Sequence, residues 1–89
     1  MAKAKVFKVT ATNDSTGKTN DEIGTLSELV RAYSYTLECG RSWEHEKGNK
    51  KINTNPKTIK SFVTNLTNAV NNTAANGYAG KSFDWEEVV

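Results

Sequence analysis

The apolar residues of this chain recur with a period of two near both ends and with a helical period in between. Residues 5–10, of sequence KVFKVT, alternate and are rich in β-branched side chains, which predicts a half-buried strand over residues 4–12. Turn formers follow, and a short second strand over residues 19–24 would complete a hairpin with Ile23 as its inward-facing anchor. Residues 81–88 predict a third strand, which would pair with the first.

A first amphipathic helix is predicted over residues 26–39. Thr25 and Glu28 have the spacing of a capping box, in which each side chain accepts a hydrogen bond from the backbone of the other residue. Gly40 stands where a left-handed residue commonly ends a helix. The apolar face of this helix follows the spacing i, i+3, i+4, i+7 and i+11: Leu26, Leu29, Val30, Tyr33 and Leu37.

A second amphipathic helix is predicted over residues 56–74. Asn55 would be its N-cap, Pro56 would occupy the first helical position, and Asn76-Gly77 would end it. Its apolar stripe repeats the spacing of the first helix: Ile59, Phe62, Val63, Leu66 and Val70. Its opposite face is expected to be polar and exposed: Lys57, Lys60, Ser61, Thr64, Asn65, Asn68, Asn71 and Asn72.

The order β-β-α-α-β predicts a single small α+β domain, residues 1–89, with both helices packed on a small antiparallel sheet. Between the helices, residues 41–55 show no periodicity, and loops of that length are often functional or mobile. Trp43 is expected to anchor this loop to the core.

Charge is distributed unevenly along the chain. The formal net charge is only +2, yet residues 47–83 contain six lysines and no aspartate or glutamate. An exposed basic stretch suits contact with an acidic surface or a polyanion. No apolar run is long enough to cross a membrane. The single cysteine, Cys39, cannot form an internal disulfide, which fits a reducing cytoplasm.

Residues that could carry catalysis are few. Cys39 and His45 could form a thiolate–imidazole pair, but no third group is evident. Glu44, His45 and Glu46 are consecutive, and a tetrahedral metal site would need a second histidine or cysteine. We therefore expect a non-enzyme without catalytic residues, a metal or a cofactor.

The basic stretch is the candidate binding site. Lysine neutralises phosphate, and asparagine can pair with the edge of adenine in the major groove. The second predicted helix would read a duplex, the preceding lysines would grip its backbone, and Trp43 could anchor a protein partner instead. The candidate residues are Lys47, Lys50, Lys51, Lys57, Lys60, Thr64, Asn65, Asn68 and Trp43.

Residues 55–62, of sequence NPKTIKSF, resemble the start of the recognition helix in LuxR-type helix-turn-helix regulators. The preceding residues 47–54 contain one apolar residue, whereas that motif needs a short apolar helix there. A broader resemblance rests on residues 36–40, 47–53 and 56–72, which together look like small accessory proteins of tailed bacteriophages. That resemblance implies a phage gene product in the cytoplasm of the bacterial host, and it implies no site residues.

Two functions follow as expectations. The first is a non-catalytic accessory protein that binds a host macromolecule, a protein in the leading hypothesis, and modulates its activity. The alternative is a small DNA- or RNA-binding module that uses residues 47–60 and the Lys/Asn face of the second helix. A homodimer is a third expectation, since a small sheet has edges that can pair.

Overall fold

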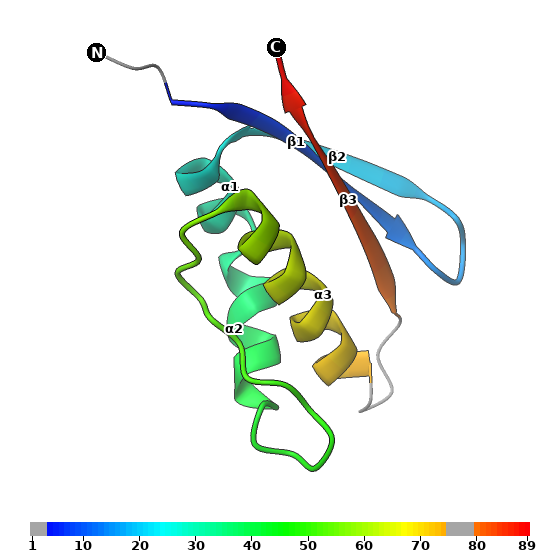
Figure 1. Ribbon diagram of the computed structural model, residues 1–89. Helices are drawn as coiled ribbons and strands as arrows, with labels where there is room; N and C mark the ends of the chain where they lie inside the picture. The colour runs from blue at the N-terminus through cyan, green and yellow to red at the C-terminus, as the bar shows by residue number, and fades with distance from the viewer. Residues whose placement is uncertain (1–3, 75–79) are drawn as a thin grey trace.

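A computed structural model describes residues 4–74 and 80–89 of the chain, which form a sheet with helices on one side (Figure 1). The α+β class and the order of strands and helices are confirmed, with the first predicted helix divided in two. The elements are β1 (Val6–Asn13), β2 (Thr19–Thr25), α1 (Leu26–Ala32), α2 (Ser34–Ser42), α3 (Ile59–Ala74) and β3 (Lys81–Val88).

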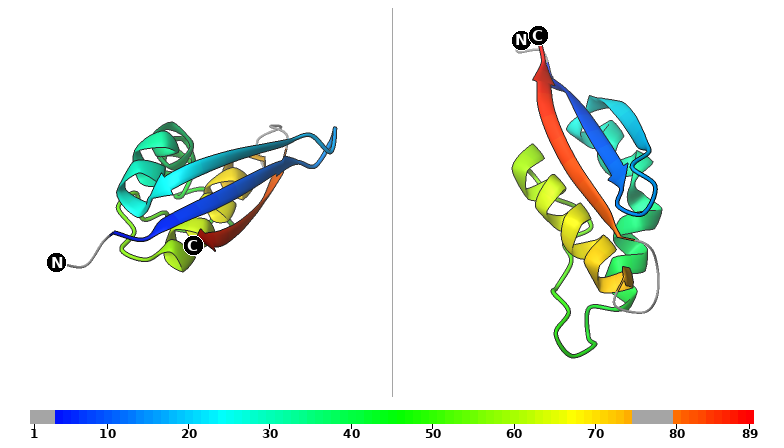
Figure 2. Two further views of the ribbon diagram at one scale, coloured as in Figure 1. Left: turned by 90° about the horizontal axis from the view of Figure 1, so that it is seen from above. Right: turned by 90° about the vertical axis from the view of Figure 1, so that its right-hand side faces the viewer.

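The sheet is antiparallel, with β1 in the centre and the strand order β2-β1-β3. Helices cover one face, and the other face is open (Figure 2). Phe7, Val9 and Ala11 are buried on the covered face, because alternate residues of a strand point to the same side. Lys8 and Thr10 therefore point to the open face.

Ile23 does not face the core, contrary to the sequence prediction. The register of the β1–β2 hairpin sets Ile23 opposite Lys8, on the open face, where Ile23 is 62% exposed. Its neighbour Gly24 lies opposite Phe7 on the covered face and is buried beneath α1. A Cβ atom on Gly24 would lie 3.1 Å from Cβ of Glu28, so the close approach of α1 leaves room for little more than glycine.

The core lies between the covered face of the sheet and the layer of α2 and α3. The ring of Tyr33, which lies between α1 and α2, packs against two aromatic rings of the core. Its centroid lies 5.9 Å from the ring centroid of Phe62 and 6.0 Å from that of Phe83. The fully enclosed apolar side chains come from all parts of the chain: Val9, Leu29, Leu37, Phe62 and Leu66.

The capping box at Thr25 is present as predicted. The Thr25 N–H donates to Oε1 of Glu28 at 2.9 Å, and the Glu28 N–H donates to Oγ1 of Thr25 at 3.3 Å. The predicted helix over residues 26–39 instead bends at Tyr33, whose φ of −103° and ψ of 14° separate α1 from α2. The bend allows α1 to contact β2 while α2 packs along α3.

Gly40 does not end a helix, as its sequence context suggested, but lies inside α2, which continues to Ser42. Its role is in packing. A Cβ atom built on Gly40 would lie 2.3 Å from Cα and 2.3 Å from Cβ of Ala69 in α3. Glycine at this position therefore lets the backbones of two helices approach each other closely.

The predicted start of the second helix is also wrong. The helix α3 begins at Ile59, and Thr58 caps it by accepting the Ser61 N–H on its hydroxyl at 3.1 Å. Pro56 is buried in the preceding loop. The predicted stop at Asn76-Gly77 lies outside the described residues.

Gly40→Ala should distinguish packing from helix propensity. Propensity alone would stabilise the protein by about 1 kcal/mol. Because the new methyl group would collide with the backbone of α3, we expect a loss of about 1–3 kcal/mol in the free energy of unfolding. Adding Ala69→Gly should restore part of that loss. Urea unfolding measures all three proteins, and a stabilised Gly40→Ala variant would contradict this packing.

Glu28→Gln should reduce the pH dependence of stability. The backbone N–H of Thr25, followed by its hydroxyl, holds the pKa of Glu28 below its ordinary 4.5. The ionised capping box is therefore fully stabilising above pH 4.5, and this contribution is lost as the pH falls through the lowered pKa. Glutamine keeps the acceptor without the charge, so the stability gap between the two proteins should shrink from about pH 6 to about pH 3. The urea midpoints of the two proteins across that pH range measure this change in the stability gap.

Candidate binding surface

The loop over residues 43–58 is held against the helices by hydrogen bonds from side chains to its backbone. The main one is made by Asn72, a residue of α3 that is only 2% exposed. Its Oδ1 accepts the Lys50 N–H at 3.0 Å, and its Nδ2 donates to the carbonyl of Lys50 at 2.8 Å. Nδ2 also donates to the carbonyl of Gly40 at 3.0 Å. One buried amide thus joins α2, α3 and the loop.

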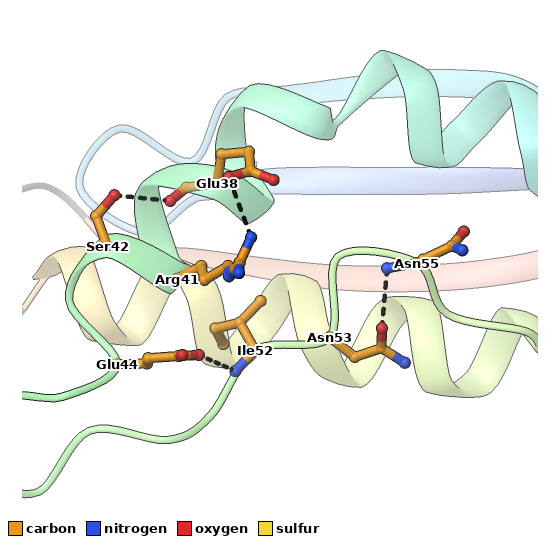
Figure 3. A network of polar contacts seen from close by, with 7 residues as sticks. All are labelled: Glu38, Arg41, Ser42, Glu44, Ile52, Asn53 and Asn55. Atoms are coloured by element: carbon orange, nitrogen blue, oxygen red, sulfur yellow. Dashed lines mark hydrogen bonds and ion pairs between the residues drawn. The ribbon is translucent and has the colours of Figure 1, made fainter.

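Asn65 holds the loop in the same way two turns earlier on α3. Its Oδ1 accepts the Asn53 N–H at 2.8 Å, while its Nδ2 donates to the carbonyl of Ser61 at 2.8 Å. Between these two attachments the side chain of Ile52 is buried. The Ile52 N–H donates to Oε2 of Glu44 at 2.9 Å (Figure 3).

These attachments give the loop a direction and a shape. Lys50 lies beside Asn72 and Asn53 beside Asn65, so the loop runs antiparallel to α3. Seven helical residues rise about 10 Å, and three loop residues span that distance only when extended. This part of the loop is therefore an extended segment laid along a helix. The backbone groups of Lys50, Ile52 and Asn53 that make these bonds face inward, and the side chains of Lys50 and Lys51 remain exposed.

The predicted lysines do not gather in one place. Lys47, Lys50 and Lys51 are exposed, and the backbone of Lys50 lies beside Asn72 near the C-terminal end of α3. Lys57 lines a depression with Lys5 and Thr58 at the N-terminal end of α3. Thirteen helical steps separate Asn72 from Ile59, so Lys50 and Lys57 lie near points of α3 about 20 Å apart, while Lys51 lines a depression with Asn65 between them.

Arg41 belongs with the first group, although it is absent from the sequence prediction. It lines a surface depression with Glu44, Lys51 and Thr54, and its guanidinium lies 3.9 Å from the carboxylate of Glu38 (Figure 3). The sequence would have indicated Arg41 as part of this surface only if the first predicted helix had been extended beyond Gly40. We name as the basic loop surface the set Arg41, Lys47, Lys50 and Lys51.

The helix face proposed to read nucleic acid is only partly exposed. Lys60 and Thr64 are exposed and Asn68 is half-buried, and these three residues follow one line of α3 at intervals of four. Asn65 was predicted to share this face, but both ends of its amide are bonded within the molecule. Asn72, also predicted to be exposed, is buried. The two asparagines bind the loop, which covers this side of the helix.

Trp43 is half-buried at the end of α2, outside the core cluster to which it was expected to anchor the loop. Its carbonyl accepts a hydrogen bond from Nδ2 of Asn49 at 2.7 Å. With Cys39, Val70 and Lys81 it lines a cavity of about 320 Å³ between α2 and α3. Tyr35, which borders the same cavity, is 81% exposed.

The two candidates for a thiolate–imidazole pair, Cys39 and His45, differ in their exposure. Cys39 is half-buried, whereas His45 is exposed and has its Nε2 3.7 Å from a carboxylate oxygen of Glu46. Over residues 4–74 and 80–89, no three side chains of the metal-binding types come together. None of the described helices is long and apolar enough to span a bilayer.

Asn72→Ala should show how much the loop attachment contributes to stability. The change leaves the N–H and carbonyl of Lys50 and the carbonyl of Gly40 without this partner, and we expect a loss of about 2–3 kcal/mol. The matched control is Asn71→Ala, because Asn71 is the exposed neighbour and its loss should stay within about 0.5 kcal/mol. Equal urea midpoints for the two variants would contradict a structural role for the buried amide.

Comparison with known proteins adds no relative from which a role could be transferred. No protein-family model, curated protein or solved structure matches this chain. A function must therefore be argued from the surfaces described above.

Proposed function

We propose that this chain is a non-catalytic protein that binds an acidic surface of a partner protein through the basic loop surface. The single observation that carries the proposal is the internal bonding of the loop. Asn65 and Asn72 satisfy its backbone from one side, so the loop holds an extended form without strand neighbours. Its lysine side chains remain exposed to solvent on a backbone whose conformation is already fixed. Such a backbone loses less conformational entropy when a partner binds.

A protein partner fits the arrangement of charge better than a nucleic acid does. The basic loop surface is short, and Glu44 and Glu46 stand beside its lysines. A surface with both signs of charge discriminates between protein partners, because a wrong partner would bring like charges together. Binding to a nucleic acid is instead strengthened by a long, unbroken row of cations that neutralises many phosphates.

The resemblance to accessory proteins of tailed bacteriophages supports a more specific version of the proposal. In this version the chain acts in the cytoplasm of the bacterial host, and the partner is a host protein whose activity changes on binding. A protein of 89 residues can act in this way without chemistry of its own, by covering a working surface of its target.

A second candidate function, binding to DNA or RNA, has one observation in its favour. Lys60, Thr64 and Asn68 lie on one line of α3 and are not used to hold the loop. In that mode Lys57 and Lys60 would contact phosphates at the N-terminal end of the helix. The loop lysines would lie about 20 Å away along the helix axis and would contact a second stretch of backbone.

Charge reversal tests both functions. Replacing the four cations of the basic loop surface by glutamate should abolish partner binding and leave the fold intact, because the four side chains are exposed: Arg41, Lys47, Lys50 and Lys51. A control with the same change of net charge uses exposed cations elsewhere: Lys5, Lys18, Arg31 and Lys81.

The measurements separate a protein partner from a nucleic acid. Both variants and the unchanged protein are used to capture partners from bacterial lysate, and are titrated into labelled duplex DNA and RNA over a salt series. We expect a protein retained by the unchanged chain and by the control but lost from the loop variant. Binding to DNA or RNA with a log–log salt slope would favour the alternative instead. Retention of the same protein by all three would refute the basic loop surface.

A further inference from the structure

The strand β3 forms one edge of the sheet along its whole length. Its eight residues pair with β1 in unbroken register from Lys81 to Val88. Within the described part of the chain, no strand pairs with its other side (Figure 2). All its side chains except that of Phe83 are exposed. A long, regular edge of this kind is a template for another strand.

The backbone groups that face outward can be identified from the ladder. The Asp14 N–H donates to the carbonyl of Gly80 at 3.1 Å, which makes these two residues a hydrogen-bonded pair. Hydrogen-bonded and non-bonded pairs alternate along an antiparallel ladder. The even-numbered residues Ser82, Asp84 and Glu86 therefore bond to β1. The N–H and carbonyl groups of Phe83, Trp85 and Glu87 point away from the sheet.

The side chains along this edge alternate between acidic and aromatic. Asp84 and Glu86 stand on the open face, opposite Thr10 and Lys8 of β1. Trp85 stands on the covered face, yet 42% of its surface is exposed because β3 is the last strand of the sheet. An incoming strand would thus meet two carboxylates on the open face, and on the covered face an indole followed by the carboxylate of Glu87.

The inner edge of β3 already shows what kind of strand it binds. On that side Nζ of Lys8 lies 2.9 Å from Oε1 of Glu86, and the ring of Phe7 stands edge-on to Trp85 with 6.0 Å between centroids. The nearby carboxylate of Glu86 raises the pKa of Lys8, as expected of an attractive pair. The strand β1 therefore binds β3 through a lysine on the open face and an aromatic ring on the covered face.

We propose that the outer edge of β3 binds an extended segment of a partner protein that places a basic side chain on one face and apolar side chains on the other. The segment would add a fourth strand, bonded to the outward groups of Phe83, Trp85 and Glu87. Its basic side chain would lie beside Asp84 and Glu86, and its apolar side chains would pack on Trp85. This site is distinct from the basic loop surface and selects the opposite charge.

A second copy of this chain is a poor occupant of the edge. In the two antiparallel self-pairings with the longest overlap, Asp84 would face either its own copy or Glu86 of the copy. Like charges directly opposite each other destabilise a strand pair. The edge of β2 is a weaker candidate for a partner, because its residues Thr19–Thr25 include no aromatic side chain.

A peptide titration tests the proposal. The probe is a fluorescein-labelled peptide of sequence KVFKVT, copied from residues 5–10, and the readout is anisotropy. We expect saturable binding to the full chain. A peptide of the same sequence with N-methyl groups on its amides keeps the charge but cannot extend a sheet, so its binding should be at least about tenfold weaker. Amide exchange by NMR should show new protection at Phe83, Trp85 and Glu87 only.

Two protein variants locate the binding edge. Asp84→Lys should weaken binding by about tenfold, because a cation would then face the basic peptide. Glu22→Lys makes the same change of charge on the exposed edge of β2 and should leave binding within about twofold. The proposal is overturned by absence of peptide binding, by equal binding of the N-methylated peptide, or by equal losses in both variants.

Discussion

The close approach of α2 and α3 at Gly40 is the contact on which the rest of the helical layer depends. Only a glycine there allows the backbone of α2 to meet Ala69. That approach brings the carbonyl of Gly40 within 3.0 Å of the Asn72 amide, which in turn holds Lys50. A buried amide is stable only when its hydrogen bonds are made, so the helix contact and the loop position require each other. The shape of the basic loop surface therefore begins inside the helical layer.

The charges of the described residues are unevenly distributed between the two layers of the molecule. The helices and the loop carry the lysines from Lys47 to Lys60, whereas the outer strands of the sheet carry five of the ten aspartates and glutamates. Lys8, in the middle of the open face, is paired with Glu86 and adds no free cation there. The two surfaces proposed above for partner binding therefore differ in their dominant charge, and each would favour a partner segment of the opposite sign.

The parts of the fold that follow from local patterns could be predicted from sequence. The capping box at Thr25, the apolar stripe of α3 and the strand over residues 81–88 each depend on residues close together in the chain. Gly40 was misassigned because a glycine needed for helix contact has the same local context as one that ends a helix. Ile23 was misassigned because the register, which decides its face, depends on the turn and on Gly24.

The candidate site was harder to predict, because polar residues that hold a loop resemble polar residues that face solvent. Asn65 and Asn72 were both assigned to an exposed face, yet both bind the loop backbone. A signal was present in their spacing. Seven residues apart, they lie on one line of a helix, next to a loop without periodicity. The lysines were correctly expected to be exposed, but their separation into two groups follows from the direction of the loop.

The position of β3 at the end of the chain has a consequence for how the molecule folds. The central strand β1 pairs with β2 across a tight turn, but its other neighbour is the last strand of the sheet. Contacts between such distant segments form slowly, since the intervening chain must be closed into a loop first. Until β3 arrives, β1 is itself an open edge that carries Phe7 and Val9. While β3 is unpaired, the chain exposes one side of its most apolar strand, and an unpaired strand edge favours aggregation.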